Sequence, residues 1–357
     1  MHPYRPSRAC RGAGMETHYV QNADLLQTLG GPRGKRMIGP APTPALAWLV
    51  SMQDSASLDG LTQPRAAQSP KSLFLPPSES VSTYGPRASP TATETQPLVM
   101  LGVRACELRA RNYLDKVLAG GEFHDPAYRR RREAITIVSC DCADCAESCF
   151  CTLVGGQPFA TEGFDVNLTP VDGGFVAEVA TDKGRQWLGQ IASTPAAPAQ
   201  LAAREKLRKE MTARLHKQNA AYATSAFESV PAKLPEGDDE GWQTFAADCV
   251  ECGACTHICP TCHCFYLYDQ AAGEDRFERV RTWDSCLLST YHRMAGTFGM
   301  KPTPRPRLSS RLANRVLHKF VYSLRQYELP GCVGCGRCVD ACLGAIDIRR
   351  VVRDLSA

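Results

Sequence analysis

Two cysteine runs constrain this chain more than any other feature. Each run has the spacing C-x2-C-x2-C-x3-C, the first at Cys249, Cys252, Cys255 and Cys259, the second at Cys332, Cys335, Cys338 and Cys342. A cubane iron–sulfur cluster offers one open valence on each of four irons, and three thiolates spaced by two residues can wrap one cluster while the fourth reaches another. We therefore predict two [4Fe–4S] clusters, one bound by Cys249, Cys252, Cys255 and Cys342, the other by Cys332, Cys335, Cys338 and Cys259.

Local residues agree with this interpretation. Gly253, Gly334 and Gly336 lie inside the two runs, where a loop folded round a ligand needs residues without a Cβ penalty. Structural zinc is the alternative, because two C-x2-C pairs suffice for one tetrahedral site, but it does not explain four thiols in each run. The pattern resembles two-cluster ferredoxin modules, except that Leu343 stands where a proline often follows the last cysteine.

The cysteine content also indicates a compartment. The chain has 18 cysteines in 357 residues, and the segment from Met1 to Gly14 is basic and lacks the apolar stretch of a secretory signal. A secreted disulfide scaffold is therefore disfavoured, and a reducing cytoplasm is expected. The apolar run from Ala45 to Val50 is too short to span a bilayer, so we predict no direct membrane span.

The net charge of +4 is modest, but basic residues gather at Arg129–Arg132 and between Lys301 and Arg325. Such runs are usually solvated faces, which is the interpretation favoured here. Docking of an acidic partner protein is the alternative. Nucleic-acid binding lacks supporting aromatic residues or a recognised motif, so no nucleic-acid partner is expected.

Hydrophobic patterning predicts an α+β chain. A strand at Leu98–Val103, a helix from Cys106 to Leu118 and a strand at Ala134–Val138 predict a βαβ unit, and a hairpin follows within residues 164–181. Residues 53–96 are expected to be extended and loop-rich, and the glycine-rich stretch 30–34 to be a turn. The predicted division is a disordered segment 1–20, an N-terminal α/β domain 21–198, a linker helix and loop 199–240, and an α-helical ferredoxin-type dicluster domain 241–357.

A third concentration of thiols lies in the N-terminal domain. Cys106 and Cys140 follow parallel strands, at the strand ends where open α/β sheets place their sites, and residues 140–151 contain five cysteines. We predict a possible third iron–sulfur cluster at Cys106, Cys140, Cys149 and Cys151. Cys142 and Cys145 could replace two of these ligands, since spacing alone does not rank them. A reduced cysteine-rich loop without metal is the other alternative.

The two ferredoxin-type runs are separated by 72 residues, too many for the compact ferredoxin fold and enough for several helices, including a basic one at 309–327. This insert carries Cys262, Cys264 and Cys286. We favour hydrogen-bonded packing around the clusters for these thiols over a site completed by a histidine. Arg337 is expected either to raise the reduction potential of a nearby cluster or to make a surface contact.

Several motifs resemble one known family. The chain resembles the β subunit of cytoplasmic sulfhydrogenases and the iron–sulfur subunit of anaerobic sulfite reductase over roughly residues 70–350, at Gly102–Leu108, Asp125–Tyr128, Cys149–Thr152, Gly163–Asp165, Cys259–Cys264 and Trp283–Cys286. The resemblance implies an iron–sulfur electron-transfer subunit that works with two partners, a flavin or NAD(P)H-binding subunit plus a catalytic subunit of the sulfite reductase or NiFe hydrogenase type. A free-standing reductase of disulfides or sulfur compounds, using the N-terminal cysteines, is the rival function, although no G-x-G-x-x-G fingerprint follows a strand.

Overall fold

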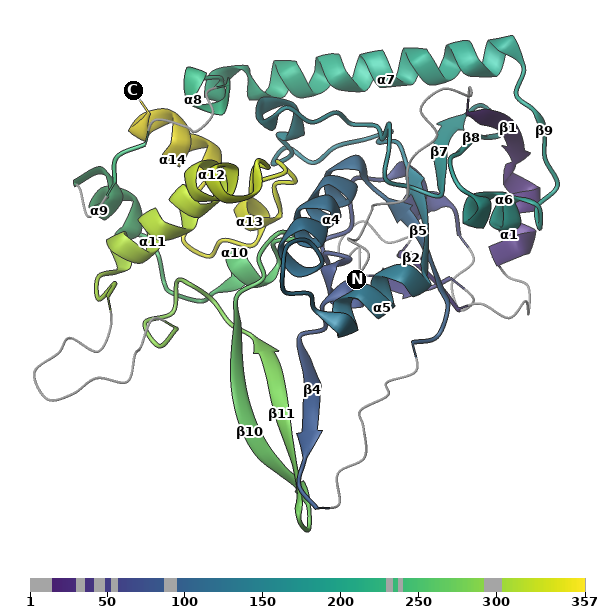
Figure 1. Cartoon of the computed structure of the whole chain (residues 1–357). Helices are drawn as coiled ribbons and strands as arrows, with labels where there is room; N and C mark the ends of the chain where they lie inside the picture. Colours follow the sequence, from purple (N-terminus) through teal and green to yellow (C-terminus); the bar gives the residue numbers. More distant parts are fainter. Residues whose placement is uncertain are drawn as a thin grey trace, which may run out of the picture. The chain divides into compact units, whose positions relative to one another are not determined.

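The computed structural model describes residues 15–29, 36–41, 49–52, 57–86, 95–228, 234–236, 240–291 and 304–356 (Figure 1). The chain divides into two compact units. Unit 1 comprises residues 1–70, 95–221 and 333–335, and unit 2 comprises residues 71–94, 222–332 and 336–357. Both units contain helices and strands, so the predicted α+β class is confirmed.

Unit 1 is built on an eight-stranded sheet with the order β3-β2-β5-β6-β7-β8-β1-β9. The neighbours β2, β5, β6 and β7 run parallel, and the strands towards both edges pair antiparallel. Buried apolar side chains such as Val99, Val138 and Leu168 form its core. The strands are β1 (Glu16–Gln21), β2 (Arg36–Pro40), β3 (Leu49–Ser51), β5 (Leu98–Val103), β6 (Ile135–Cys140), β7 (Val166–Val171), β8 (Gly174–Val179) and β9 (Thr194–Pro195).

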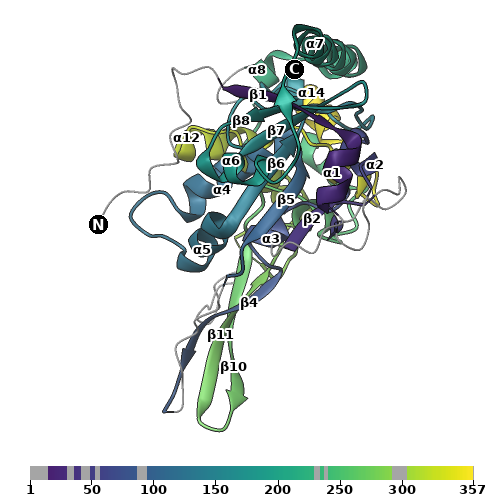
Figure 2. The same cartoon turned by 90° about the vertical axis from the view of Figure 1, so that its right-hand side faces the viewer.

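The predicted strand–helix–strand segment is confirmed. β5 and β6 pair in parallel with Leu98 opposite Ile135, and helix α4 (Ala105–Leu118) connects them through α5 (Pro126–Ala134). Asp125 begins α5, because its carboxylate accepts from the amides of Ala127 and Tyr128 at 3.0 and 2.9 Å. Figure 2 shows α4, α5 and α6 (Asp182–Leu188) on one side of the sheet and α1 (Asn22–Leu29) on the other. The predicted hairpin is β7 and β8, which extends the sheet.

The division of the chain differs from the predicted one. Residues 1–14 and the glycine-rich stretch 30–34 lie outside the described residues, but residues 16–20 belong to β1, so the prediction of disorder through residue 20 is wrong there. The predicted linker helix is α7 (Pro198–Asn219), and it belongs to unit 1. Its side chains Met211 and Leu215 are buried against the cysteine-rich loop, which a free linker would not provide.

Unit 2 is mainly helical and carries most of both ferredoxin-type runs. Its helices are α3 (Lys71–Phe74), α8 (Ser225–Glu228), α9 (Glu240–Ala246), α10 (Ala254–His257), α11 (Leu308–Leu317), α12 (Ser323–Tyr327), α13 (Arg337–Asp340) and α14 (Ile348–Leu355). The predicted basic helix at 309–327 corresponds to α11 and α12, joined without a break by a π-helical turn at His318–Tyr322.

The sequence predicted several helices in the insert between the two runs, but the structure also contains strands there. The insert begins with a β-hairpin, β10 (Phe265–Gly273) and β11 (Arg276–Trp283), and β11 pairs with β4 (Ser78–Tyr84) from the region predicted to be loop-rich (Figure 1). The residues of β10 are mostly exposed, so this strand lacks the apolar–polar alternation on which a strand prediction depends. Within the described residues, no helix combines the length and the apolar character needed to cross a membrane.

Candidate iron–sulfur centres

The first predicted quartet surrounds one cavity in unit 2. Cys249, Cys252 and Cys255 approach it from the first run, and Cys342 approaches from the end of the second. A fifth thiol, that of Cys338 from the second predicted quartet, also lines this cavity, whereas Cys259 does not. The remaining wall is mostly apolar and includes Leu287, Leu312, Val316, Ile346, Ile348 and Val351. The structure therefore brings together the four thiols that the interleaved pairing predicts for one cluster.

Backbone geometry brings this quartet together. Gly253 adopts a φ of +69°, which turns the chain into α10 between Cys252 and Cys255. Gly344 permits the close approach of the second run, because a Cβ at this position would fall 1.9 Å from the carbonyl oxygen of Asp248. The amide of Ile346 donates to the sulfur of Cys342 at 3.2 Å. Amide donors of this kind stabilise thiolate ligands and tune a bound cluster.

The second quartet has three members in unit 2, Cys259, Cys332 and Cys338, whereas Cys335 belongs to unit 1 together with Val333 and Gly334. This ligand set stays a prediction. Cys259 already has polar support, since the hydroxyl of Thr261 lies 3.2 Å from its sulfur. Gly334 and Gly336 have φ values of +66° and +74°, as the predicted ligand loop requires.

Arg315 is a cation shared by thiols of both quartets. It is 5% exposed, and its Nη2 donates to the carbonyl of Cys255 at 3.3 Å. Burial alone would lower the pKa of Arg315, but the thiolates of Cys255, Cys338, Cys262 and Cys259 raise it well above its usual value. Its buried Nε has no hydrogen-bond partner in the described part of the chain. This donor fits the need of an anionic cluster for nearby N–H groups.

Two buried lysines add to the positive charge of unit 2. The ammonium of Lys319 donates to Thr261 Oγ1 at 2.7 Å, and that hydroxyl in turn donates to the carbonyl of Gly331 at 2.6 Å. The ammonium of Lys71 donates to the carbonyl of Cys262 at 3.0 Å and lies 3.8 Å from the centre of the Trp283 ring. Both lysines are 3% exposed.

These cations correct the interpretation of the basic segment. Arg311, Arg315 and Lys319 are buried, at 2%, 5% and 3% exposed, rather than lying on a solvated face. Their spacing of four residues places them on one side of α11 and its continuation, which was the available signal. Lys71, in contrast, lies in a region without a recognisable pattern. Arg337 is 1% exposed, so the surface-contact alternative for it is wrong.

The N-terminal thiols are not grouped as predicted. Cys140 lies in the core of the sheet, and its thiol contacts the carbonyl of Leu61 at 3.4 Å. Cys106 packs with Ala110, Val333 and Cys335 instead. The cysteines that pack together, against Met211, Leu215 and Leu207 of α7, are Cys142, Cys145, Cys149 and Cys151. This group includes Cys142 and Cys145, the two thiols that the sequence left open as replacements for two of the predicted ligands.

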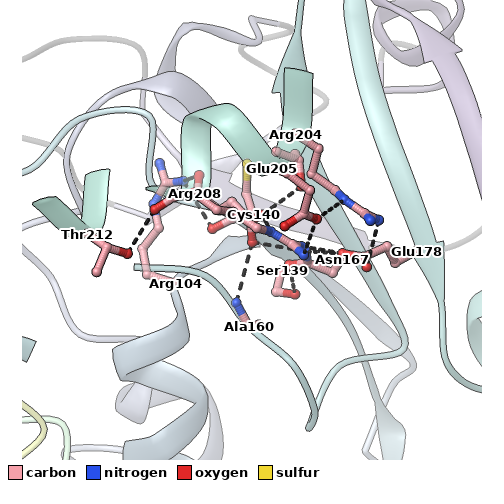
Figure 3. Close-up of polar contacts among 12 residues, drawn as sticks. Arg104, Ser139, Cys140, Ala160, Asn167, Glu178, Arg204, Glu205, Arg208 and Thr212 are labelled. Atoms are coloured by element: carbon pink, nitrogen blue, oxygen red, sulfur yellow. Dashed lines mark hydrogen bonds and ion pairs between the residues drawn. The ribbon is translucent and has the colours of Figure 1, made fainter. Parts of the chain in front are cut away.

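A buried ionic network holds the start of the cysteine-rich loop. Asp141 is 1% exposed and accepts from Thr169 Oγ1 at 2.6 Å, Arg208 Nε at 2.7 Å and Asn167 Nδ2 at 3.0 Å. Arg208 and Asn167 also contact Glu178, which ties α7 to β7 and β8 (Figure 3). Arg104 donates to the carbonyls of Cys140, Asp141, Gly60, Leu61 and Gln63. The loop is therefore fixed at its entry by two arginines.

Gly334 makes a close approach to the same loop within unit 1. Its carbonyl accepts from the amide of Phe150 at 2.8 Å, and a Cβ at Gly334 would fall 2.5 Å from the Cα of Cys151. We expect Gly334→Ala to lower the free energy of unfolding more than Gly155→Ala does. Both glycines have positive φ, which costs an alanine about 1–2 kcal/mol, but a Cβ at Gly155 meets nothing within 4 Å.

Denaturant titration of both variants, followed by far-UV circular dichroism under anaerobic conditions, measures this difference. The Gly155→Ala variant isolates the strain of the left-handed backbone from the steric overlap with Cys151. Equal losses in the two variants would contradict the close approach.

The thiols of the insert form hydrogen-bonded pairs. Cys262 is paired with Cys259, and Cys286 is paired with Cys264. The hydrogen bond from Cys286 is the main cause that lowers the pKa of Cys264 to about 6. A hydrogen bond from Tyr291 lowers this pKa further, whereas burial raises it. His263 is held neutral, because burial lowers its pKa to about 4. This arrangement agrees with the hydrogen-bonded packing favoured from the sequence.

The donor sets can be compared with what a metal group requires. In the part of the chain that the structure describes, no three His, Cys, Asp or Glu side chains converge closely enough to hold a single ion. A cubane is larger, and it distributes its four thiolate ligands over four irons. The thiols of Cys249, Cys252, Cys255 and Cys342, four of the five around one apolar cavity, fit such a group, as do the amide donor at Cys342 and the unpaired Nε of Arg315.

Comparison with known proteins agrees with the geometry. Residues 248–346 match the family model described as a 4Fe-4S dicluster domain. The fold and the site thus define an iron–sulfur electron-transfer protein with two [4Fe–4S] clusters. Over 317 residues the chain is 29% identical to Sulfhydrogenase 2 subunit beta of Pyrococcus furiosus, which covers 86% of this chain and 87% of the relative. No solved structure matches the chain.

Proposed function

We propose that this chain is the electron-relay subunit of a cytoplasmic oxidoreductase complex. It carries electrons between a subunit that binds flavin and NAD(P)H and a catalytic subunit, of the sulfite reductase or NiFe hydrogenase type. Similarity to a sulfhydrogenase β subunit over most of both chains supports the complex. The cysteines of the described segments are in the reduced form, which supports the cytoplasmic location.

The observation that carries this proposal is the convergence of Cys249, Cys252, Cys255 and Cys342 on one apolar cavity. We assign these four residues as ligands of one cluster and Cys259, Cys332, Cys335 and Cys338 as ligands of the other. A bound [4Fe–4S] cluster accepts and releases one electron at a time. Leu312, Val316 and Val351 keep water away from the first site, and Arg315 offsets the negative charge that an added electron brings.

The relay function is tested with the anaerobically purified chain, alone and with its co-purified partner subunits. Alone, the chain should take up electrons from dithionite, seen as paramagnetic clusters, and should show no turnover of sulfite, polysulfide or hydrogen. Turnover should require the complex. Sustained reduction of a disulfide or sulfur compound by the chain alone, with an artificial donor, would instead support the free-standing reductase.

Removal of the charge of Arg315 should lower the reduction potential of the clusters. The reduced state carries more negative charge, so a nearby cation stabilises it and raises the potential. At an effective dielectric constant of about 20, a unit charge within several ångströms is worth roughly 2–3 kcal/mol, which is on the order of 100 mV for one electron. Potentiometric titration of Arg315→Gln, followed by electron paramagnetic resonance, should show a shift of this order and sign.

The matched control is Arg325→Gln. Arg325 lies two helical turns or more beyond Arg315, its side chain is 58% exposed, and its ion pair with Glu236 spans 3.7 Å. A solvated charge of this kind has little influence on a buried centre. The role assigned to Arg315 is wrong if the two variants shift the potential equally or if Arg315→Gln raises it.

A further inference from the structure

The cysteine-rich loop of unit 1 gathers four thiols that the two-cluster assignment does not use. Cys145 and Cys151 are buried, and Cys142 and Cys149 are half-buried beside the same side chains of α7. The thiols influence one another directly. Burial is the main cause that raises the pKa of Cys151 to about 12, and the charge of the neighbouring Cys149 thiolate adds to this rise. Burial is also the main reason that the pKa of Cys142 is raised, and Cys151 and Cys149 add to this rise.

We propose that Cys142, Cys145, Cys149 and Cys151 bind a third iron–sulfur cluster, in unit 1. The proposal goes beyond the relay function, because it assigns a metal site outside the dicluster domain. Four thiolates are the complete ligand set of either a [2Fe–2S] or a [4Fe–4S] cluster. Neither Cys106 nor Cys140 is part of this site, because each packs in a different group.

The loop is held in place independently of the thiols. The carbonyl of Cys149 accepts from Gln218 Nε2 at 2.7 Å and from Asn219 Nδ2 at 2.9 Å, which anchors it to the end of α7. The amide of Cys142 donates to the carbonyl of Pro158 at 2.8 Å. Together with the buried contacts of Asp141, these bonds fix the backbone at the start of the loop and at Cys149. A backbone that is already ordered before a ligand binds favours binding, because less conformational entropy is lost in the binding step.

Two arginines lie near members of the four-thiol group. Arg104 lies near Cys142 and Arg109 near Cys151, and each lowers the pKa of its neighbour against the dominant effect of burial. Arg109 is also incompletely satisfied. Its Nη2 donates to the carbonyl of Val154 at 2.9 Å, while its buried Nη1 finds no hydrogen-bond partner among the described residues. An anionic cluster bound at the neighbouring thiol would provide the hydrogen-bond acceptor that this buried N–H lacks.

The site contacts the tripeptide that carries Cys335. Within unit 1, the sulfur of Cys149 lies 3.9 Å from the carbonyl oxygen of Cys335, and the amide of Phe150 donates to Gly334. Arg65 bridges the same two segments, since it donates to the carbonyl of Cys335 and to Ser148 Oγ. Cys335 is an assigned ligand of the second cluster. A third cluster held here would contact a segment of unit 1 that carries one assigned ligand of the second cluster, and it would accept or supply single electrons without exchange of a proton or a bond.

Iron and acid-labile sulfide per chain provide the test, in the anaerobically purified full-length protein after reconstitution. Two cubanes account for about eight iron atoms per chain. The unmodified protein should hold about two more if the third cluster is [2Fe–2S], or about four more if it is [4Fe–4S]. In Cys145→Ala/Cys149→Ala this excess should disappear, while the paramagnetic signals of the two other clusters remain. Those retained signals also report that the variant has folded.

Two matched controls are Cys106→Ala and Cys140→Ala, which remove thiols from the same unit but not from the four-cysteine group. Both should retain the excess iron. The proposal is overturned if the unmodified protein holds only the iron of two cubanes, if the double variant keeps the excess, or if the additional metal is zinc without additional sulfide. If the protein instead lacked the two other clusters and kept the additional iron, the result would contradict the ligands assigned to those two clusters and would support this site.

Discussion

The double variant Cys252→Ala/Cys342→Ala should lose one cluster and keep the other intact. In the interleaved assignment both residues serve the same cluster, and both line the same cavity. About four iron atoms per chain should therefore be lost relative to the unmodified protein, with the paramagnetic signal of one [4Fe–4S] cluster unchanged. This is the largest effect expected in unit 2, because a complete redox centre disappears.

The matched variant Cys252→Ala/Cys259→Ala removes the same number of thiols but takes one from each assigned quartet. Both clusters should then be damaged, and the intact signal should be lost. If each run instead bound its own cluster, the outcomes would be exchanged, since Cys252 and Cys259 would share a cluster and Cys342 would belong to the other. Iron analysis combined with paramagnetic resonance of both variants therefore decides the pairing.

Asp141→Ala should destabilise unit 1 by roughly 3–5 kcal/mol, the usual cost of removing one member of a buried ion pair. The substitution leaves Arg208, Thr169 and Asn167 without an acceptor that they contact at 2.6 to 3.0 Å. Arg208 retains Glu178 as a second carboxylate, which limits the loss. A lower urea midpoint by far-UV circular dichroism, under anaerobic conditions, would report the change.

Asp144→Ala is the control, three residues further along the same loop. Asp144 also pairs with an arginine, Arg214, at 2.7 Å, but the two side chains are 44% and 53% exposed. An exposed pair contributes about 0–1 kcal/mol, so this variant should differ little from the unmodified protein. A loss in Asp141→Ala no greater than in Asp144→Ala would show that the buried network does not hold the loop.

The elements predicted correctly are those whose pattern is local in the chain. The βαβ segment from Leu98 to Cys140 combines two continuous apolar strands with a helix of clear period, and the structure follows it closely. The helix within residues 199–240 was also predicted, but its assignment as a linker was wrong. Its apolar stripe is short, and only the loop packed against Met211 and Leu215 shows why those residues are apolar.

The buried cations were missed for a related reason. Arg311, Arg315 and Lys319 lie in a basic segment, and composition alone favours a solvated face for such a run. Their burial becomes favourable only where carbonyls and thiolates converge on them, as Cys255 does on Arg315. Lys71 is contributed from nearly 200 residues away from Cys262, which no local pattern could indicate.

By itself the sequence determined the class of centre and its eight candidate thiolates. The spacing within a cysteine run is a local property of the chain, so it does not depend on the residues that pack around the run. Only the tertiary structure decided which of the six N-terminal thiols lie together. Cys106 and Cys140 follow strands of one sheet and are buried in different groups, whereas α7, about sixty residues later in the chain, closes over Cys142, Cys145, Cys149 and Cys151. Packing between distant segments determines such a choice, and spacing along the chain does not contain it.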